Sequence, residues 1–120
     1  SNDIILCSLE VMNNIIAVGN KEGNINVYEI SSGQQIANLK GHKAGVCKLA
    51  MISNSGKKYL ASGSDYGCSS IVLWDISTWN MRMKIENHKA AISAIVDLND
   101  NRSMISGSYD KSINIYNLNS

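Results

Sequence analysis

Three side chains in the middle of this sequence, His42, Ser62 and Asp65, are of the types that build a nucleophilic catalytic triad. In such a triad the histidine takes the proton of the attacking serine hydroxyl, and the carboxylate orients the imidazole. The chemistry depends on the geometry of the three groups and not on their order in the chain. Whether these residues form a triad or a structural hydrogen-bond chain therefore depends on the elements that hold them.

The composition leaves few other chemistries open. The 120 residues include two histidines and three cysteines, and the cysteines form no CxxC pair. We therefore expect no zinc site and no cofactor. With 11 basic and 10 acidic residues, the net charge of +1 indicates neither nucleic acid nor a membrane as a partner. Scattered, odd-numbered cysteines are typical of a reducing compartment, so an intracellular location, cytoplasmic or nuclear, is expected.

Landmarks of three kinds recur along the chain at one spacing. The glycines are 44 residues apart, the histidines 46, and the aromatic residues 46 and 42. A period of about 40–45 residues is that of propeller repeats. The landmarks are Gly19, Gly63 and Gly107; His42 and His88; and Tyr28, Trp74 and Tyr116.

Each period contains short β-branched runs separated by polar turn residues, and no window keeps a helical period. The sequence therefore predicts an all-β fold of antiparallel four-stranded sheets. The expected units are approximately 4–40, 46–86 and 92–117, all within one partial domain over residues 1–120. The third unit lacks its fourth strand. The expected strands are 4–9, 15–18, 25–28 and 35–39; 46–51, 59–62, 70–74 and 81–85; and 92–98, 103–106 and 113–116.

The stretch "KGHKAGVCKLAMISNSGKKYLASGSD…SSIVLWDIS" resembles a WD40 repeat almost throughout. Gly41-His42 matches the GH dipeptide of that family and Trp74-Asp75 its WD dipeptide. The stretch "HKAAISAIVDLNDNRSMISGSYDKSINIYN" follows the same template, with Tyr116-Asn117 in the WD position. The resemblance implies a β-propeller, with about three blades in this chain and an incomplete ring.

In WD40 repeats the GH histidine, a serine, a turn aspartate and the WD tryptophan form a buried hydrogen-bond chain. A neutral imidazole has one donor and one acceptor, so it can join an aspartate to a serine. One active site would need only one such set, whereas the resemblance implies two. We therefore favour a structural brace and expect no enzymatic activity. The implied brace residues are His42, Ser62, Asp65 and Trp74, and His88, Ser106, Asp110 and Tyr116.

The sequence departs from the family pattern in places. Asn87 stands where the second unit has Gly41, and Val18 stands where the other units have Ser62 and Ser106. Two extra residues in the turn of the second unit leave open whether Asp65 or a neighbour holds the aspartate position.

In this family, one face of the ring carries the loops before each first strand and the hairpins between second and third strands. Basic and tyrosine side chains on such loops are candidates for partner binding. Trp79 stands where the first unit has Gly33, on the opposite face, and either folds over its own blade or meets a partner. The candidates are Lys43, Tyr66, Trp79, Lys89, Tyr109 and Lys111, with Lys21, Ala44 and Ala90 in the same loops.

These observations predict a non-catalytic platform for recognition of other proteins or peptides. The alternative is an assembly segment whose open blades associate with copies of the chain, or with the rest of a longer chain, to close a propeller.

Overall fold

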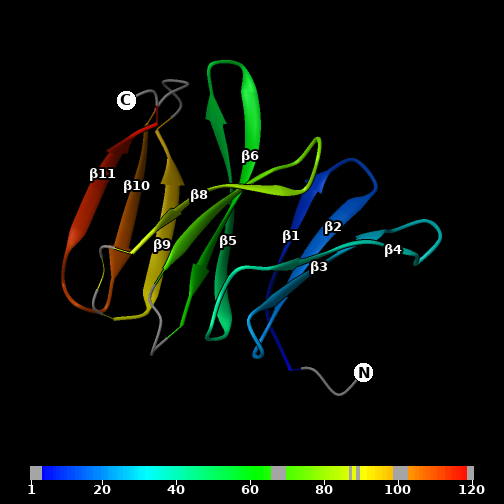
Figure 1. Ribbon diagram of the computed structural model, residues 1–120, viewed down its shortest axis with the longest axis horizontal. Coiled ribbons are helices and arrows are strands. Elements are labelled where there is room, and N and C mark those ends of the chain that lie inside the picture. The colour runs from blue at the N-terminus through cyan, green and yellow to red at the C-terminus, as the bar shows by residue number, and fades with distance from the viewer. Residues whose placement is uncertain (1–3, 66–69, 87, 89, 99–102, 119–120) are drawn as a thin grey trace.

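The computed structural model describes residues 4–65, 70–86, 88, 90–98 and 103–118. These residues form eleven β-strands, and among them there is no helix that could cross a membrane. Three separate antiparallel sheets stand side by side in chain order, and the two ends of the chain lie at opposite ends of the row (Figure 1). The all-β architecture expected from the sequence is confirmed.

Each sheet is one blade. Blade one contains β1 (Ile5–Met12), β2 (Ile15–Asn20), β3 (Asn24–Glu29) and β4 (Gln35–Lys40). Blade two contains β5 (Val46–Asn54), β6 (Lys57–Ser64), β7 (Ile71–Asp75) and β8 (Asn80–Ile85). Blade three contains β9 (Ile92–Asp97), β10 (Ser103–Ser108) and β11 (Ile113–Asn117). Within each blade every strand pairs with the next along the chain.

The outer hairpins of blades one and two have Gly33 and Trp79 at equivalent positions in their turns. Gly33, in the β3–β4 turn, has φ +72°, and Trp79, in the β7–β8 turn, has φ +60°. This left-handed conformation suits glycine and is uncommon for a bulky side chain. The Trp79 amide nevertheless donates to the Asp75 carbonyl at 2.6 Å. The indole also packs against the core between blades one and two.

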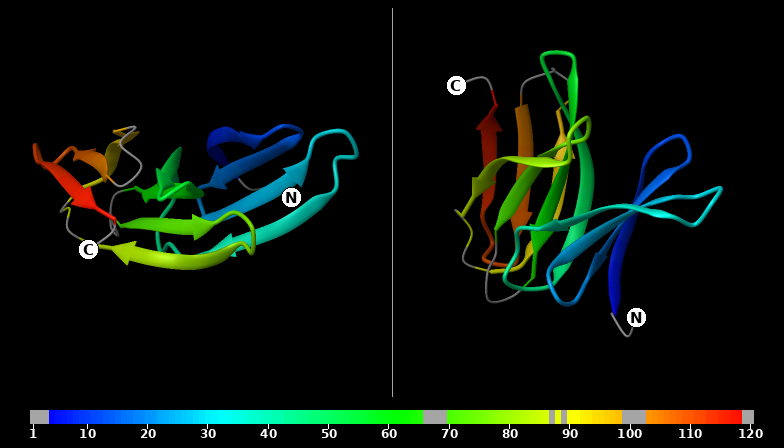
Figure 2. Two further views of the ribbon diagram at one scale, coloured as in Figure 1. Left: turned by 90° about the horizontal axis from the view of Figure 1, so that it is seen from above. Right: turned by 45° about the vertical axis from the view of Figure 1, so that its right-hand side comes forward.

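The hydrophobic core lies between blades, because each sheet uses a different face for each neighbour. One cluster joins Ile25 and Val27 of blade one to Leu49 and Leu60 of blade two. A second joins Leu73 of blade two to residues of blade three. The blade-three members of this second cluster are Ile92, Ile95, Met104 and Leu118. Figure 2 shows the three sheets stacked as successive layers in the view from above.

Two glycines allow the backbones of neighbouring blades to approach closely. A Cβ added to Gly19 of β2 would lie 2.7 Å from Cγ1 of Val46, the first residue of β5. A Cβ on Gly63 of β6 would lie 2.7 Å from Cγ2 of Ile92, the first residue of β9. Both distances are below any normal van der Waals contact. Each following blade thus begins with a β-branched side chain seated on a glycine of the blade before it.

Two thiols lie at the same blade interfaces. Cys7 Sγ donates to the Val46 carbonyl at 3.3 Å, and Cys47 Sγ donates to the Ile92 carbonyl at 3.2 Å. Burial raises the pKa of Cys7 to about 11 and also raises that of Cys47. Both side chains therefore remain protonated thiols at neutral pH. Cys68, the third cysteine, lies outside the described residues.

The glycine contacts lead to a matched pair of variants. Gly63→Ala should lower the free energy of unfolding by about 1–3 kcal/mol, because its methyl group overlaps Ile92. Gly107→Ala, at the equivalent place in β10, should change it by less than about 0.5 kcal/mol, since its added Cβ meets nothing nearer than 3.6 Å. Urea unfolding in dilute solution, followed by tryptophan fluorescence, measures both. Equal losses would contradict this account of the interface.

Candidate functional site

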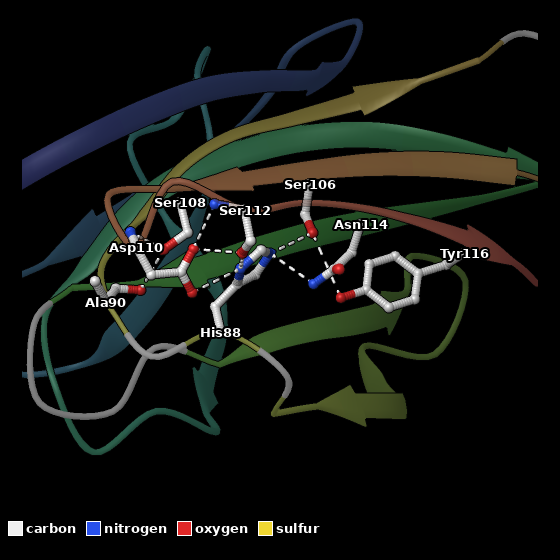
Figure 3. A network of polar contacts seen from close by, with 8 residues as sticks. All are labelled: His88, Ala90, Ser106, Ser108, Asp110, Ser112, Asn114 and Tyr116. Atoms are coloured by element: carbon white, nitrogen blue, oxygen red, sulfur yellow. Dashed lines mark hydrogen bonds and ion pairs between the residues drawn. The ribbon is translucent and has the colours of Figure 1, made fainter.

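The histidine of blade three is the centre of a hydrogen-bond network that runs along the β10–β11 hairpin (Figure 3). His88 Nε2 lies 2.7 Å from Ser106 Oγ of β10. On the other side of the ring, Nδ1 lies 2.9 Å from Ser112 Oγ and 3.3 Å from Asp110 Oδ2. The hydroxyls of Ser106 and Tyr116 are 3.5 Å apart, so the network ends at the aromatic residue of β11. The structure thus brings all four residues of the expected third-unit set together.

The partners of His88 indicate one tautomer. Asn114 Nδ2, which can only donate, lies 3.3 Å from Nε2. Nε2 therefore accepts, and Nδ1 carries the proton and points it toward Asp110 and Ser112. Asp110 in turn accepts from the Ser112 amide at 2.8 Å and from the Ser112 hydroxyl. The carboxylate thus organises the β10–β11 turn as well as the imidazole.

Blade two builds the same network with different residues at one end. His42 Nε2 lies 2.7 Å from Ser62 Oγ, and Trp74 Nε1 donates to that oxygen at 2.9 Å. His42 Nδ1, however, lies 2.9 Å from the hydroxyl of Ser70. Asp65 is the aspartate expected in this network. Its amide donates to the Gly45 carbonyl at 2.7 Å, which joins the end of β6 to the loop before β5.

The GH and WD dipeptides touch each other directly. A Cβ added to Gly41 would lie 2.8 Å from Cζ2 of Trp74, so the glycine makes room for the indole while His42 reaches it through Ser62. The aspartate of the dipeptide has a separate role. Asp75 accepts from the Ser77 amide at 2.9 Å and pairs with Lys57 at 2.6 Å. Lys57 and Ser77 together lower the pKa of Asp75 to about 2.

Sequence reasoning missed the serines that contact Nδ1. Ser70 and Ser112 each stand directly before the first residue of the third strand, Ile71 or Ile113. This Ser-Ile pair recurs in both units and was a signal available in the sequence. Ser70 is also tied to its own turn, because its amide donates to Ser64 Oγ at 2.7 Å.

Blade one has no equivalent network among its described residues. Val18 occupies the serine position, pairing with Asn26 as Ser62 pairs with Val72 and Ser106 with Asn114. The side-chain oxygen of Asn26 is buried without a hydrogen-bond partner. An unsatisfied buried acceptor costs about 1–3 kcal/mol, so blade one is less well stabilised on this face than the other two.

The burial of both serines removes the catalytic interpretation of these sets. Ser62 and Ser106 are each 0% exposed, so no substrate could reach either hydroxyl. Ser62 Oγ also accepts the Trp74 indole hydrogen, which ties it into the sheet. No group of three or more potential metal-ligating side chains is found among the residues that the structure describes.

The residues expected to bind partners fall into three groups. Lys43, Tyr109 and Lys111 are exposed on loops at the end of the blades where the first strands begin. Tyr66 and Lys89 lie outside the described residues. Trp79 packs against the core between blades one and two, which is the first of its two expected arrangements.

A family model described as "WD domain, G-beta repeat" matches residues 33–75 and 79–117, more than half of the chain. The chain belongs to the WD40 family. Each matched WD40 repeat contains the fourth strand of one blade and the first three strands of the next. The repeats are therefore offset from the blades by one strand, which accounts for the three-stranded third sheet.

Three similar curated proteins are much longer than this chain. Topless-related protein 3 of Arabidopsis thaliana is 32% identical over 73 residues, which cover 61% of this chain and 6% of that protein. Protein FIZZY-RELATED 1 of the same plant is 29% identical over 103 residues, covering 85% and 20%. Protein tipD of Dictyostelium discoideum is 23% identical over 118 residues, covering 98% and 18%. The chain thus spans a fifth or less of these relatives.

Solved WD40 propellers share the fold. A chain in the crystal structure of the mitotic checkpoint complex has a TM-score of 0.82 at 20% identity, covering 100% of this chain and 36% of that one. The crystal structure of the RRP9 WD40 repeats has a TM-score of 0.80 at 24% identity, covering 99% and 37%. The expected β-propeller architecture is confirmed.

We expect Asp110→Ala to lower the free energy of unfolding by about 1–3 kcal/mol, because it leaves the Ser112 amide without its acceptor and removes one of the two partners of His88 Nδ1. Asp110→Asn keeps one acceptor oxygen and should lose clearly less. Urea unfolding compares the two variants. A hydrolytic activity that disappeared in Asp110→Ala without loss of stability would contradict the structural role.

The environment of His42 leads to a pH dependence. Burial, with a smaller contribution from Lys84, lowers the pKa of His42 to about 4. The unfolded chain takes up this proton near pH 6.5 and the folded chain only near pH 4. Stability is therefore full above pH 6.5 and falls as the pH is lowered toward 4, by on the order of 3 kcal/mol for this group.

Urea unfolding from pH 7.5 to pH 4 measures this loss, with His42→Gln as the control. The variant should be less stable at pH 7.5 and should lose less stability on acidification than the wild type. An identical pH dependence in both proteins would assign the effect to other groups.

Proposed function

We propose that this chain is a non-catalytic scaffold that binds other proteins through the rim where its blades begin. This entry rim consists of the loops before β5 and β9 and the hairpins β2–β3 and β10–β11. WD40 proteins generally act as platforms for protein–protein interaction. The structurally similar chain in the crystal structure of the mitotic checkpoint complex is a member of that complex.

The observation that carries the proposal is a backbone bond that recurs in every blade. The Lys21 amide donates to the Ile4 carbonyl at 2.8 Å, and the Tyr109 amide donates to the Ala91 carbonyl at 3.1 Å. The Asp65 amide makes the same bond to Gly45. Each hairpin is thereby fixed to the loop that enters its own blade. Side chains on the rim are presented from a rigid backbone, which reduces the entropy lost on binding.

Tyr109 is the best-placed anchor on this rim. Its side chain is 75% exposed while its amide is fixed to Ala91. A tyrosine offers a large amphipathic contact area with few rotatable bonds, which is why tyrosines recur as anchors in interfaces. On the described part of the rim the exposed charged side chains are Lys21, Lys43 and Lys111, with Glu22 and Glu86 as the acids. Together with the tyrosine, the lysines suit a peptide segment that carries an apolar group and an acidic residue.

An intracellular location, cytoplasmic or nuclear, suits both this function and the protonated, unpaired thiols of Cys7 and Cys47. Nucleic acid and membranes remain outside the proposed set of partners, because the net charge is +1.

A second candidate function is assembly into a closed propeller, with copies of this chain or with further WD40 blades. The supporting observation is the exposure of large aliphatic side chains on both end blades. Ile5 of blade one and Ile113 of blade three are among them. In the sheets of propellers such surfaces are covered by a neighbouring blade.

Alanine substitutions of Tyr109 and of Trp79 test the scaffold proposal. Tyr109→Ala should weaken binding of the partner at least about tenfold and leave the melting temperature within about 1 °C, because the side chain is exposed. Trp79→Ala should lower the melting temperature by several degrees, because its indole packs on the core. Partners are captured from lysate on immobilised wild-type chain, identified by mass spectrometry and titrated as purified proteins.

If Tyr109→Ala binds every captured partner as tightly as the wild type does, the entry rim is not the binding surface. Because the partner is proposed to contact the lysines of the rim, affinity should also fall as salt is raised.

A further inference from the structure

One methionine closes the contact between the GH and WD dipeptides of blade two from the outside. Met81 of β8 pairs with Trp74 across the sheet, so the two side chains lie on the same face. A Cβ added to Gly41 would lie 3.1 Å from Cε of Met81 and 2.9 Å from Cη2 of Trp74. The thioether methyl group and the edge of the indole thus meet at the residue that directly follows the last strand of blade one.

The two side chains in this contact differ in exposure. Trp74 is 3% exposed, whereas Met81 is 45% exposed. Met81 lies on β8, the edge strand of its sheet, and its methyl group touches Gly41 between blades one and two. Its exposure is therefore a property of an internal contact between two blades. A small oxidant can reach the thioether while the methyl group still covers the buried indole.

The other methionines provide a comparison. Met81 and Met12 are the exposed ones among the five, at 45% and 42%. Met51 and Met83 are half-buried against the two cores, and Met104 is 0% exposed. Met12 is the last residue of β1 in blade one, whose described residues form no histidine network. The two exposed methionines thus share their access to an oxidant and differ in what they contact.

Peroxides oxidise a thioether by removing two electrons from the sulfur. The O–O bond of hydrogen peroxide breaks, one oxygen bonds to the sulfur, and the other leaves with two protons as water. Methionine sulfoxide reductases reverse the step by oxidising two thiols to a disulfide and releasing the oxygen as water. The sulfoxide is polar and accepts hydrogen bonds, so it favours water over an apolar contact.

We propose that Met81 is an oxidation-sensitive switch, in which a peroxide converts the thioether to the sulfoxide and thereby loosens the contact between Gly41 and Trp74. The added oxygen needs a hydrogen-bond donor, which the methyl group in its present place against the glycine and the indole does not need. The oxidised side chain therefore turns toward water and leaves the indole edge open to solvent. Reduction of the sulfoxide restores the apolar side chain and closes the contact again.

The contact is connected to the entry rim through the network of blade two. Trp74 Nε1 donates to Ser62 Oγ at 2.9 Å, and His42 Nε2 lies 2.7 Å from the same oxygen. Lys43, the next residue, is one of the exposed lysines of the rim. Oxidation of Met81 should therefore make the loop before β5 less rigid and weaken binding that uses Lys43. This last step alone rests on the proposed scaffold function.

Two pairs of substitutions separate Met81 from Met12. Met81→Leu and Met12→Leu keep an apolar side chain of similar volume that peroxide does not oxidise. Met81→Gln and Met12→Gln place a polar side chain of similar length at each position and imitate the sulfoxide without an oxidant. All are made in a Cys68→Ser chain, because peroxide also oxidises cysteines. Cys7 and Cys47 are half-buried, protonated thiols and react slowly.

Each chain is treated with hydrogen peroxide at neutral pH, and peptide mass spectrometry identifies the methionines that have gained an oxygen. Oxidation of Met81 should lower the melting temperature by at least about 4 °C, and sulfoxide reductases should restore it. Met12→Leu should respond as the parent chain does. Met81→Leu should keep its melting temperature although Met12 is oxidised. Met81→Gln should reproduce the loss without peroxide, and Met12→Gln should not.

Hydrogen exchange at the Trp74 indole locates the effect. Its Nε1–H is bonded to Ser62 and should exchange at least about tenfold faster in the oxidised chain than in the reduced one. Comparison with Trp79→Phe assigns the signal. A general loss of stability would accelerate exchange in all three blades alike, whereas loosening of this contact accelerates exchange of the indole more than that of the β10 amides.

The proposal fails if Met81 stays reduced while Met12 is oxidised, or if its sulfoxide leaves both the melting temperature and the indole exchange unchanged. It also fails if the loss persists after the reductases have removed the oxygen. An equal loss in Met81→Leu would assign the effect to another residue. These measurements need no binding partner, so they are independent of the test at Tyr109. Unchanged partner binding by an oxidised chain with a loosened contact would remove only the link to the entry rim.

Discussion

The packing of one blade on the next is the interaction on which the rest of this structure depends. A single sheet of three or four short strands cannot bury its apolar side chains, and here it does so only against its neighbour. The glycine in each second strand sets how close two sheets can come, and a β-branched residue fills the space that it leaves. Both hydrophobic clusters lie between blades. A larger side chain at one of these glycines therefore pushes two sheets apart and does not simply create a local cavity.

The polar networks depend on this packing, because the apolar interfaces exclude water from them. Inside blades two and three every ring nitrogen of the two histidines has a partner, as a buried polar network requires. The networks join the loop before the first strand to the second and third strands, so they fix the loops of the entry rim. Ser112 in blade three and Ser70 in blade two contact Nδ1 at the same distance, and Asp110 adds a further acceptor in blade three. A serine before the third strand is therefore a partner of the imidazole in both blades.

Much of the fold could be predicted from the sequence because the same pattern of residues recurs in each unit. The spacing of glycines, histidines and aromatic residues predicts the sheets, and the resemblance to WD40 repeats predicts the contacts of His42 and His88. Ser70 was not predicted, because the longer turn of blade two hides its equivalence with Ser112. The arrangement of Trp79 was also left open. A tryptophan in a glycine position suggests exposure, whereas its left-handed backbone turns the indole onto the core.

The two thiols at the blade interfaces have a consequence for how opening of the molecule could be followed. Cys7 bonds across the contact between blades one and two, and Cys47 across the contact between blades two and three. Both are half-buried and protonated in the folded chain, so alkylating reagents should react with them faster when the neighbouring sheets separate. The labelling rate of each cysteine therefore reports on opening of one interface. With Cys68 replaced by serine, the two rates would reveal whether the row of sheets opens from one end or as a unit.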